Sequence, residues 1–69
     1  MTVYPNPTSD TLTFSQETAK IQIYDISGKL MRTFTNTAKI RINDLPAGTY
    51  IIRMKDQNGI MNLEKVIKQ

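Results

Sequence analysis

The sequence predicts an all-β fold, a small Ig-like antiparallel β-sandwich of six to seven short strands. Runs in which apolar and polar residues alternate recur along the 69-residue chain, and a period of two is typical of half-buried strands. Turn signals separate these runs at intervals of about eight to twelve residues, which is typical of a sandwich or barrel. No run combines helical spacing with a cap, so no helix is expected.

The chain opens with a proline-rich segment, residues 3–8. Pro5 and Pro7 exclude a helix and favour an extended or turned path. Val3 and Tyr4 are expected to form a short edge strand, because an edge strand tolerates a following proline.

Two alternating runs follow, at residues 11–14 and 20–24. Their inward positions carry large apolar side chains, namely Leu12, Phe14, Ile21 and Ile23. Residues 15–18 are polar and are expected to form a turn between the two runs. The sequence therefore predicts two separate strands here.

A hairpin turn is expected at residues 25–28. Asp25 can accept a hydrogen bond from the backbone N–H two residues on, and Gly28 supplies a left-handed position at no steric cost. The next run, residues 29–34, alternates less cleanly, which a β-bulge would explain.

After a polar loop at residues 35–38, a further strand is expected at residues 39–42. Its inward positions are Ile40 and Ile42. The regular alternation and the two β-branched side chains are typical of a strand.

The strongest turn signal precedes the most regular strand. In residues 45–48, Pro46 fixes its own φ and Gly48 can adopt a positive φ. The strand that follows has an inward face made of Tyr50, Ile52 and Met54.

The last run, residues 60–68, follows a second Asp-to-Gly turn and has an ambiguous register. One face carries Met61, Leu63 and Ile67, with Lys65 among them, whereas the other carries Ile60 and Val66. We predict that the first face packs in the core.

Composition excludes several classes of function. There is no Cys and no His, so neither a disulfide nor a structural zinc site is expected. The formal net charge is +3, but the basic residues are scattered, whereas a nucleic-acid binder usually clusters them. No apolar run approaches the roughly 20 residues that span a membrane.

No catalytic arrangement is visible, so the chain is not expected to be an enzyme or to hold a cofactor. The three serines have no His to activate them. The carboxylates are dispersed, and Asp25 and Asp56 are better explained as turn formers. Residues 56–59 resemble the start of a calcium loop but lack its later ligands. Whether Tyr4 and Tyr24 form an aromatic binding surface stays open.

Four motifs in a fixed order carry a family resemblance. They are Tyr-Pro-Asn-Pro at residues 4–7, Ile-Gln-Ile-Tyr-Asp-Ile-Ser-Gly-Lys at 21–29, Ile-Asn-Asp-Leu-Pro-Ala-Gly-Thr-Tyr at 42–50 and Lys-Val-Ile-Lys-Gln at 65–69. In this order and length they resemble the type A C-terminal sorting domain of the type IX (Por) secretion system of Bacteroidetes. The resemblance covers essentially the whole chain.

The resemblance implies a role in protein export. Residues 1–69 would be a single C-terminal sorting domain of a larger secreted protein, with an N-terminal cargo domain before it. A leader elsewhere would direct the protein to the periplasm, since the residues after Met1 resemble no leader and Met1 itself looks like an added start. The outer-membrane translocon and its shuttle barrel would then recognise the domain. A sortase-like cysteine protease would remove it, leaving the cargo secreted or on the cell surface and often attached to lipopolysaccharide.

The resemblance also implies which residues are recognised, namely Gly48, Tyr50, Lys65, Val66, Ile67, Lys68 and Gln69. Simpler roles compete: Gly48 suits a turn, Tyr50 suits the core, and Lys65 can extend its ammonium group to solvent. The run from residue 60 onward is the expected docking element, by strand addition to a partner.

Two other functions stay open at this point. The domain could be an Ig-like or fibronectin-like accessory module that binds glycan or protein. It could instead be a small structural domain that associates weakly with itself through exposed strand edges.

Overall fold

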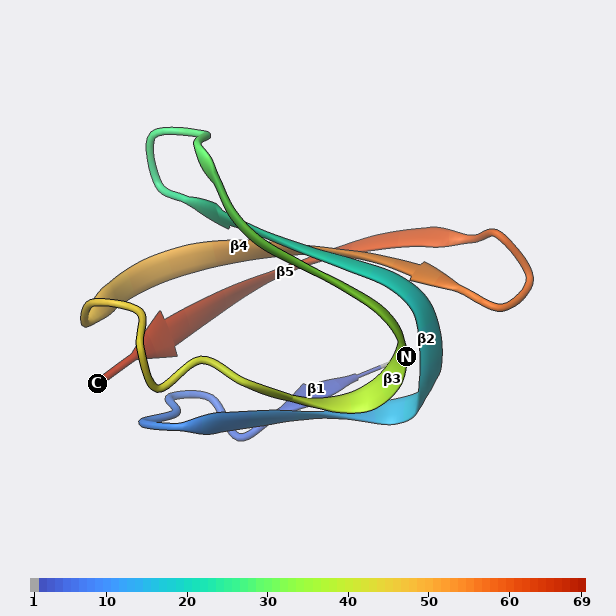
Figure 1. Ribbon diagram of the computed structural model, residues 1–69, viewed down its shortest axis with the longest axis horizontal. Helices are drawn as coiled ribbons and strands as arrows, with labels where there is room; N and C mark the ends of the chain where they lie inside the picture. Colours follow the sequence, from blue (N-terminus) through green and yellow to red (C-terminus); the bar gives the residue numbers. More distant parts are fainter. Residues whose placement is uncertain (1) are drawn as a thin grey trace.

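The computed structural model describes residues 2–69, which form an all-β structure without a helix (Figure 1). The interpretation of Met1 as an added start lies outside these residues. The described strands are β1 (Val3–Tyr4), β2 (Thr11–Asp25), β3 (Leu30–Arg41), β4 (Gly48–Asp56) and β5 (Met61–Lys68). They form one antiparallel sheet in the order β1-β2-β4-β5, with β3 paired to β2. No helix that could span a membrane is found within residues 2–69.

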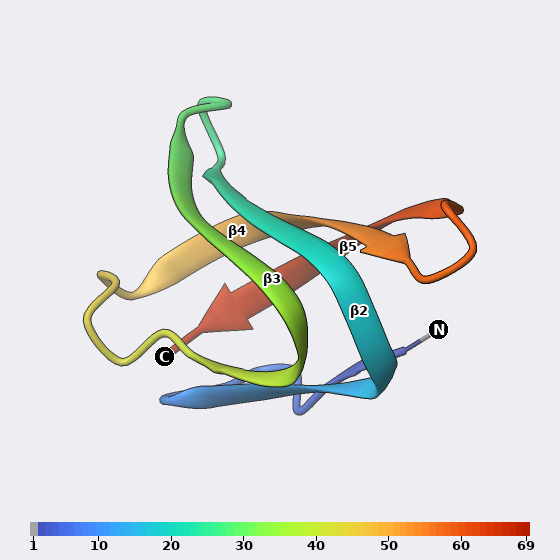
Figure 2. The same cartoon turned by 45° about the vertical axis from the view of Figure 1, so that its right-hand side comes forward.

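The sheet curls because β2 and β3 bend together. The two strands pair on both sides of a register shift that falls between Thr13 and Thr18. The first part of β2 also pairs with β1, and the second part pairs with β4. The first part of β2 and β1 therefore lie in a layer that faces β4 and β5 (Figures 1 and 2).

The predicted sandwich of six to seven strands is not confirmed in the described residues, which form a curled sheet of five. The strands predicted at residues 11–14 and 20–24 are one strand, β2, and those predicted at 29–34 and 39–42 are likewise joined in β3. The polar residues 15–18 and 35–38, which were expected to interrupt them, lie within β2 and β3. Neither segment contains the Gly or Pro that would reverse the chain, so β2 and β3 bend here and pair on both sides of the bend.

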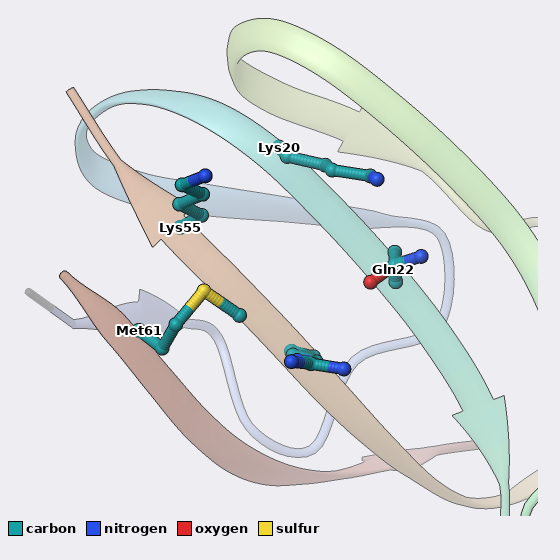
Figure 3. Close-up of a pocket in the computed structure, with 5 residues that line it drawn as sticks. Lys20, Gln22, Lys55 and Met61 are labelled. Carbon is teal, nitrogen blue, oxygen red and sulfur yellow. The ribbon is translucent and has the colours of Figure 1, made fainter. Parts of the chain in front are cut away.

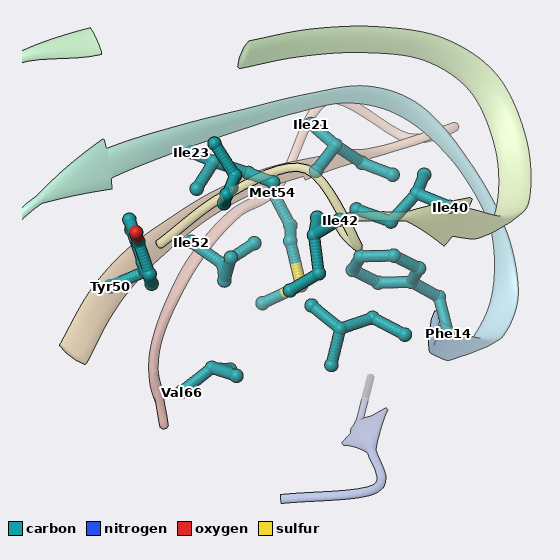
Figure 4. Close-up of a cluster of buried hydrophobic side chains, with 11 residues drawn as sticks. Phe14, Ile21, Ile23, Ile40, Ile42, Tyr50, Ile52, Met54 and Val66 are labelled. Atoms are coloured by element: carbon teal, nitrogen blue, oxygen red, sulfur yellow. The ribbon is translucent and has the colours of Figure 1, made fainter. Parts of the chain in front are cut away.

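The core fills the space inside the curl (Figure 4). All nine inward positions predicted for the strands up to Met54 are buried, and Leu45 and Val66 join them. The buried apolar side chains are Leu12, Phe14, Ile21, Ile23, Ile40, Ile42, Leu45, Tyr50, Ile52, Met54 and Val66.

The predicted core face of the last strand is wrong. Val66 is 0% exposed, whereas Leu63 is 68% exposed and Met61 and Ile67 are also exposed. The cause is the register with β4: Val66 lies opposite Tyr50, and residues directly opposite in a ladder point to the same face. The number of apolar residues on each face of β5 therefore predicted the wrong face as buried.

Both predicted Asp-to-Gly turns are confirmed. The Asp25 and Asp56 side chains each accept two backbone N–H groups at 2.9 Å, from residues two and four positions on. Gly28 and Gly59 have φ values of 93° and 83°. The bulge expected in residues 29–34 is confirmed as a register shift in the β2–β3 pair beside the first turn.

Candidate functional site

The end of β5 is held between two neighbours. On one side it pairs with β4, where Lys68 lies opposite Gly48 and Val66 opposite Tyr50. On the other side lies the segment that follows β1, in which Thr8 forms a parallel bridge with Lys68. The curled sheet is thus closed at this point, because residues next to β1 bond to the last strand.

Backbone hydrogen bonds make this closure. The Thr8 N–H donates to the Ile67 carbonyl at 2.9 Å, and the Gln69 N–H donates to the Thr8 carbonyl at 2.7 Å. Both distances are typical of good N–H···O bonds. The final residues of the chain therefore pair on both sides and are not an open edge.

The Asn6 side chain extends the closure by one more pair of bonds. Its Nδ2 donates to the Lys65 carbonyl at 3.0 Å, and its Oδ1 accepts the Ile67 N–H at 2.9 Å. The carboxamide carries one donor and one acceptor toward the strand, as a peptide group of a neighbouring strand does. The adjacent Pro5 and Pro7 have no N–H, so the side chain of Asn6 supplies the donor that the backbone there lacks.

We call residues 6–8, 48–50 and 65–69 the terminal ladder. Sequence reasoning missed Asn6 and Thr8 as members of this site, although residues 4–7 were part of the family resemblance. The position of Asn6 between two prolines could have predicted its role, because the prolines have no N–H and the Asn6 side chain is the main donor of that segment. The first Asp-to-Gly turn also adjoins the ladder, because Asp25 lies opposite Tyr50.

The structure brings all the sequence-predicted site residues together in the terminal ladder. Their orientations divide them into two groups. Tyr50, Val66 and Lys68 are buried, whereas Gly48, Lys65, Ile67 and Gln69 are exposed.

The buried members have structural contacts. The Tyr50 hydroxyl donates to the Pro46 carbonyl at 2.5 Å, which ties β4 to the turn before it. Lys68 is only 8% exposed. The pKa of the Asp44 carboxyl is lowered, mainly by the hydrogen bond from Arg32 at 2.7 Å and in smaller part by the charge of Lys68.

Catalytic chemistry has little support among the described residues. The Ser27 hydroxyl donates to Asp25 Oδ1 at 2.6 Å, and this bond, followed by one from the Lys29 N–H, lowers the pKa of Asp25. A carboxylate with a lowered pKa is a weak base. No cluster of three or more His, Cys, Asp or Glu side chains that could hold a metal occurs in residues 2–69. The ladder offers hydrogen bonds and apolar contacts, which suit recognition.

The chain was compared with models of known protein families. The family model described as "Secretion system C-terminal sorting domain" matches residues 2–69. No curated protein matches the chain. The matched region includes every residue of the terminal ladder.

Proposed function

The chain belongs to the family of secretion system C-terminal sorting domains, and from that membership we propose that it directs a cargo protein across the outer membrane. The family comprises sorting signals of type IX secretion, which implies recognition by that machinery and a cargo that is secreted or held at the cell surface. In our proposal residues 1–69 are one non-catalytic module at the C-terminal end of a larger protein. The translocon and its shuttle barrel bind it, and a sortase-like cysteine protease removes it.

The observation that carries this proposal is the arrangement of the terminal ladder. We assign the recognition role to its exposed members, Lys65, Ile67 and Gln69, with Gly48 beside them. The buried members, Tyr50, Val66 and Lys68, hold the exposed ones in place. Recognition then depends on a surface that exists only in the folded domain, because β4 pairs with β5 on one side of it and Asn6 and Thr8 bond to it on the other.

A fusion assay tests this function. The domain is attached behind a periplasm-directed fluorescent protein in a bacterium with type IX secretion, and fluorescence at the surface and in the medium is compared with that in the periplasm. Deletion of residues 65–69 would also remove a core side chain, Val66, so point variants of exposed residues are preferable. We choose Lys65→Ala combined with Ile67→Ala, because both side chains are exposed and the backbone bonds remain.

Export of the wild-type fusion and retention of the double variant is the expected result. Lys39→Ala is the matched control, since Lys39 is exposed and lies outside the ladder. Retention of the folded wild-type fusion would contradict the proposed function. A rise in melting temperature with added carbohydrate would then favour an accessory glycan-binding module. Equal export of both fusions would refute only the assignment of Lys65 and Ile67.

A further inference from the structure

The outward face of β2, β4 and β5 collects unpaired cations. Lys20 lies directly opposite Lys55, Gln22 opposite Arg53, and Ile51 opposite Lys65. Residues directly opposite share a face, so four cations from three adjacent strands project to the same side. All four side chains are exposed. We call Lys20, Arg53, Lys55 and Lys65 the basic face.

No carboxylate in the described residues neutralises this face. Asp10 and Asp44 pair with Arg41 and Arg32, and these are the salt bridges that residues 2–69 form. Asp25 and Asp56 bond turn N–H groups, Glu17 lies at the bend of β2, and Glu64 lies opposite the core residue Ile52. The basic face therefore attracts negative charge from outside the domain.

Lys20 and Lys55 lie directly opposite each other in the ladder, and this arrangement indicates a binding role. Like charges directly opposite in a ladder destabilise a sheet, so packing gives no reason for this pair. The two lysines line a shallow hollow of about 270 Å³ together with Gln22, Arg53 and Met61. Figure 3 shows Lys20, Gln22, Lys55 and Met61 projecting from neighbouring strands around it.

A second feature beside the basic face fits a polypeptide. The Ile67 N–H and carbonyl both point away from β4, toward Asn6 and Thr8. Because backbone groups alternate along a strand, those of Leu63 point the same way. In residues 2–69 no strand lies beyond β5 at Leu63, so this half of the edge is open. The exposed Met61 and Leu63 side chains flank it with apolar surface.

We propose that an acidic, extended polypeptide segment of the secretion machinery docks on the basic face and along the open half of β5. Its backbone adds to the edge at Leu63, and its carboxylates lie over Lys20, Arg53 and Lys55. The charge of the face selects an anionic partner, and the open backbone edge selects a polypeptide over a lipid headgroup or a free phosphate. This inference rests on the proposed sorting function and names the chemistry of the partner.

Binding is tested with an isotope-labelled domain and a ten-residue peptide that alternates Glu with Val. Saturable shifts of the Leu63, Arg53 and Lys55 amides are expected, and added salt should weaken them. Arg53→Glu combined with Lys55→Glu should lower the affinity at least about tenfold, whereas Lys39→Glu should not. Three results would overturn the inference: no binding, equal binding of a Gln–Val peptide, or equivalent shifts with inorganic phosphate or anionic phospholipid vesicles.

A cellular test separates this inference from the sorting function itself. Lys20→Glu places a carboxylate opposite Lys55, so the isolated domain should melt at a higher temperature while export of the fluorescent fusion falls. A purely structural role for Lys20 cannot produce that combination. If the wild-type fusion is not exported, the sorting function fails. If the wild-type fusion is exported and the charge-reversed fusions are exported equally, only the docking inference fails.

Discussion

Substitution of Asn6 by Ala tests whether the N-terminal segment holds the last strand. The variant loses two hydrogen bonds, to the Lys65 carbonyl and from the Ile67 N–H. A typical hydrogen bond contributes a net free energy of about 0.5–1.5 kcal/mol, and exposed bonds such as these lie in the lower half of that range. We therefore expect a loss of about 1–2 kcal/mol in the free energy of unfolding of the closure.

Amide hydrogen exchange of the isolated domain measures this loss locally. The Ile67 amide should exchange about tenfold faster in the variant, since a factor of ten corresponds to about 1.4 kcal/mol. The Val66 amide points to β4, because backbone groups alternate along the strand, and it serves as the internal reference. A larger change at Ile67 than at Val66 would show that the closure opens while the β4–β5 pair persists.

The matched control is Asn58→Ala, because the Asn58 side chain makes no hydrogen bond within residues 2–69 and lies in an exposed turn. Asn6→Asp keeps an acceptor for the Ile67 N–H but loses the donor to Lys65, so an intermediate effect is expected. Unchanged exchange of the Ile67 amide in Asn6→Ala would refute the contribution of the Asn6 side chain to the closure. Equal acceleration at Ile67 and Val66 would show global destabilisation instead.

Two further predictions follow from burial and charge. Val66→Ala should lower the free energy of unfolding by about 2 kcal/mol, and Ile67→Ala should lower it by less than half of that, because only Val66 is fully buried. Urea denaturation measures both losses, and similar losses for the two variants would contradict the register of β5. The Ser27 hydroxyl and the Lys29 N–H lower the pKa of Asp25 below its ordinary value of 3.8, so the resulting stability is present above that pH and is lost as pH falls through the lower folded-state pKa. In a plot of melting temperature against pH, Asp25→Asn should therefore reduce the fall in melting temperature at acid pH. An unchanged fall would show that Asp25 does not contribute to the stability lost there.

The two turns and the alternation of buried and exposed residues in β4 were predicted correctly from the sequence, because the interactions that produce them involve residues close together in the chain. The Asp25 turn requires a side-chain acceptor and a residue that adopts positive φ, and both lie within four positions. The same holds for the Asp56 turn and for the alternation of Tyr50, Ile52 and Met54. Each of these depends on neighbours in the chain and not on the rest of the fold.

The features that were missed depend on partners distant in sequence. The buried face of β5 is determined by its pairing with β4, and three exposed apolar side chains gave the opposite indication. The continuity of β2 depends on pairing with β3 on both sides of polar residues that resemble a turn. The bond from Asn6 to Lys65 spans 59 positions, and periodicity in a short window carries no information on such a contact.

The long-range closure has a consequence for how a sorting signal is mapped. Removal of the last five residues deletes exposed groups, a buried apolar side chain and the partners of Asn6 and Thr8 at once. Loss of export after such a truncation is therefore expected from unfolding as well as from loss of a recognised surface. Asn6→Ala separates the two explanations, because it removes the side-chain bonds to Lys65 and Ile67 and leaves every residue of the C-terminal segment in place. If the machinery reads an extended peptide, this variant should be exported as well as the wild type or better; if it reads the folded terminal ladder, export should fall with the local opening that hydrogen exchange measures.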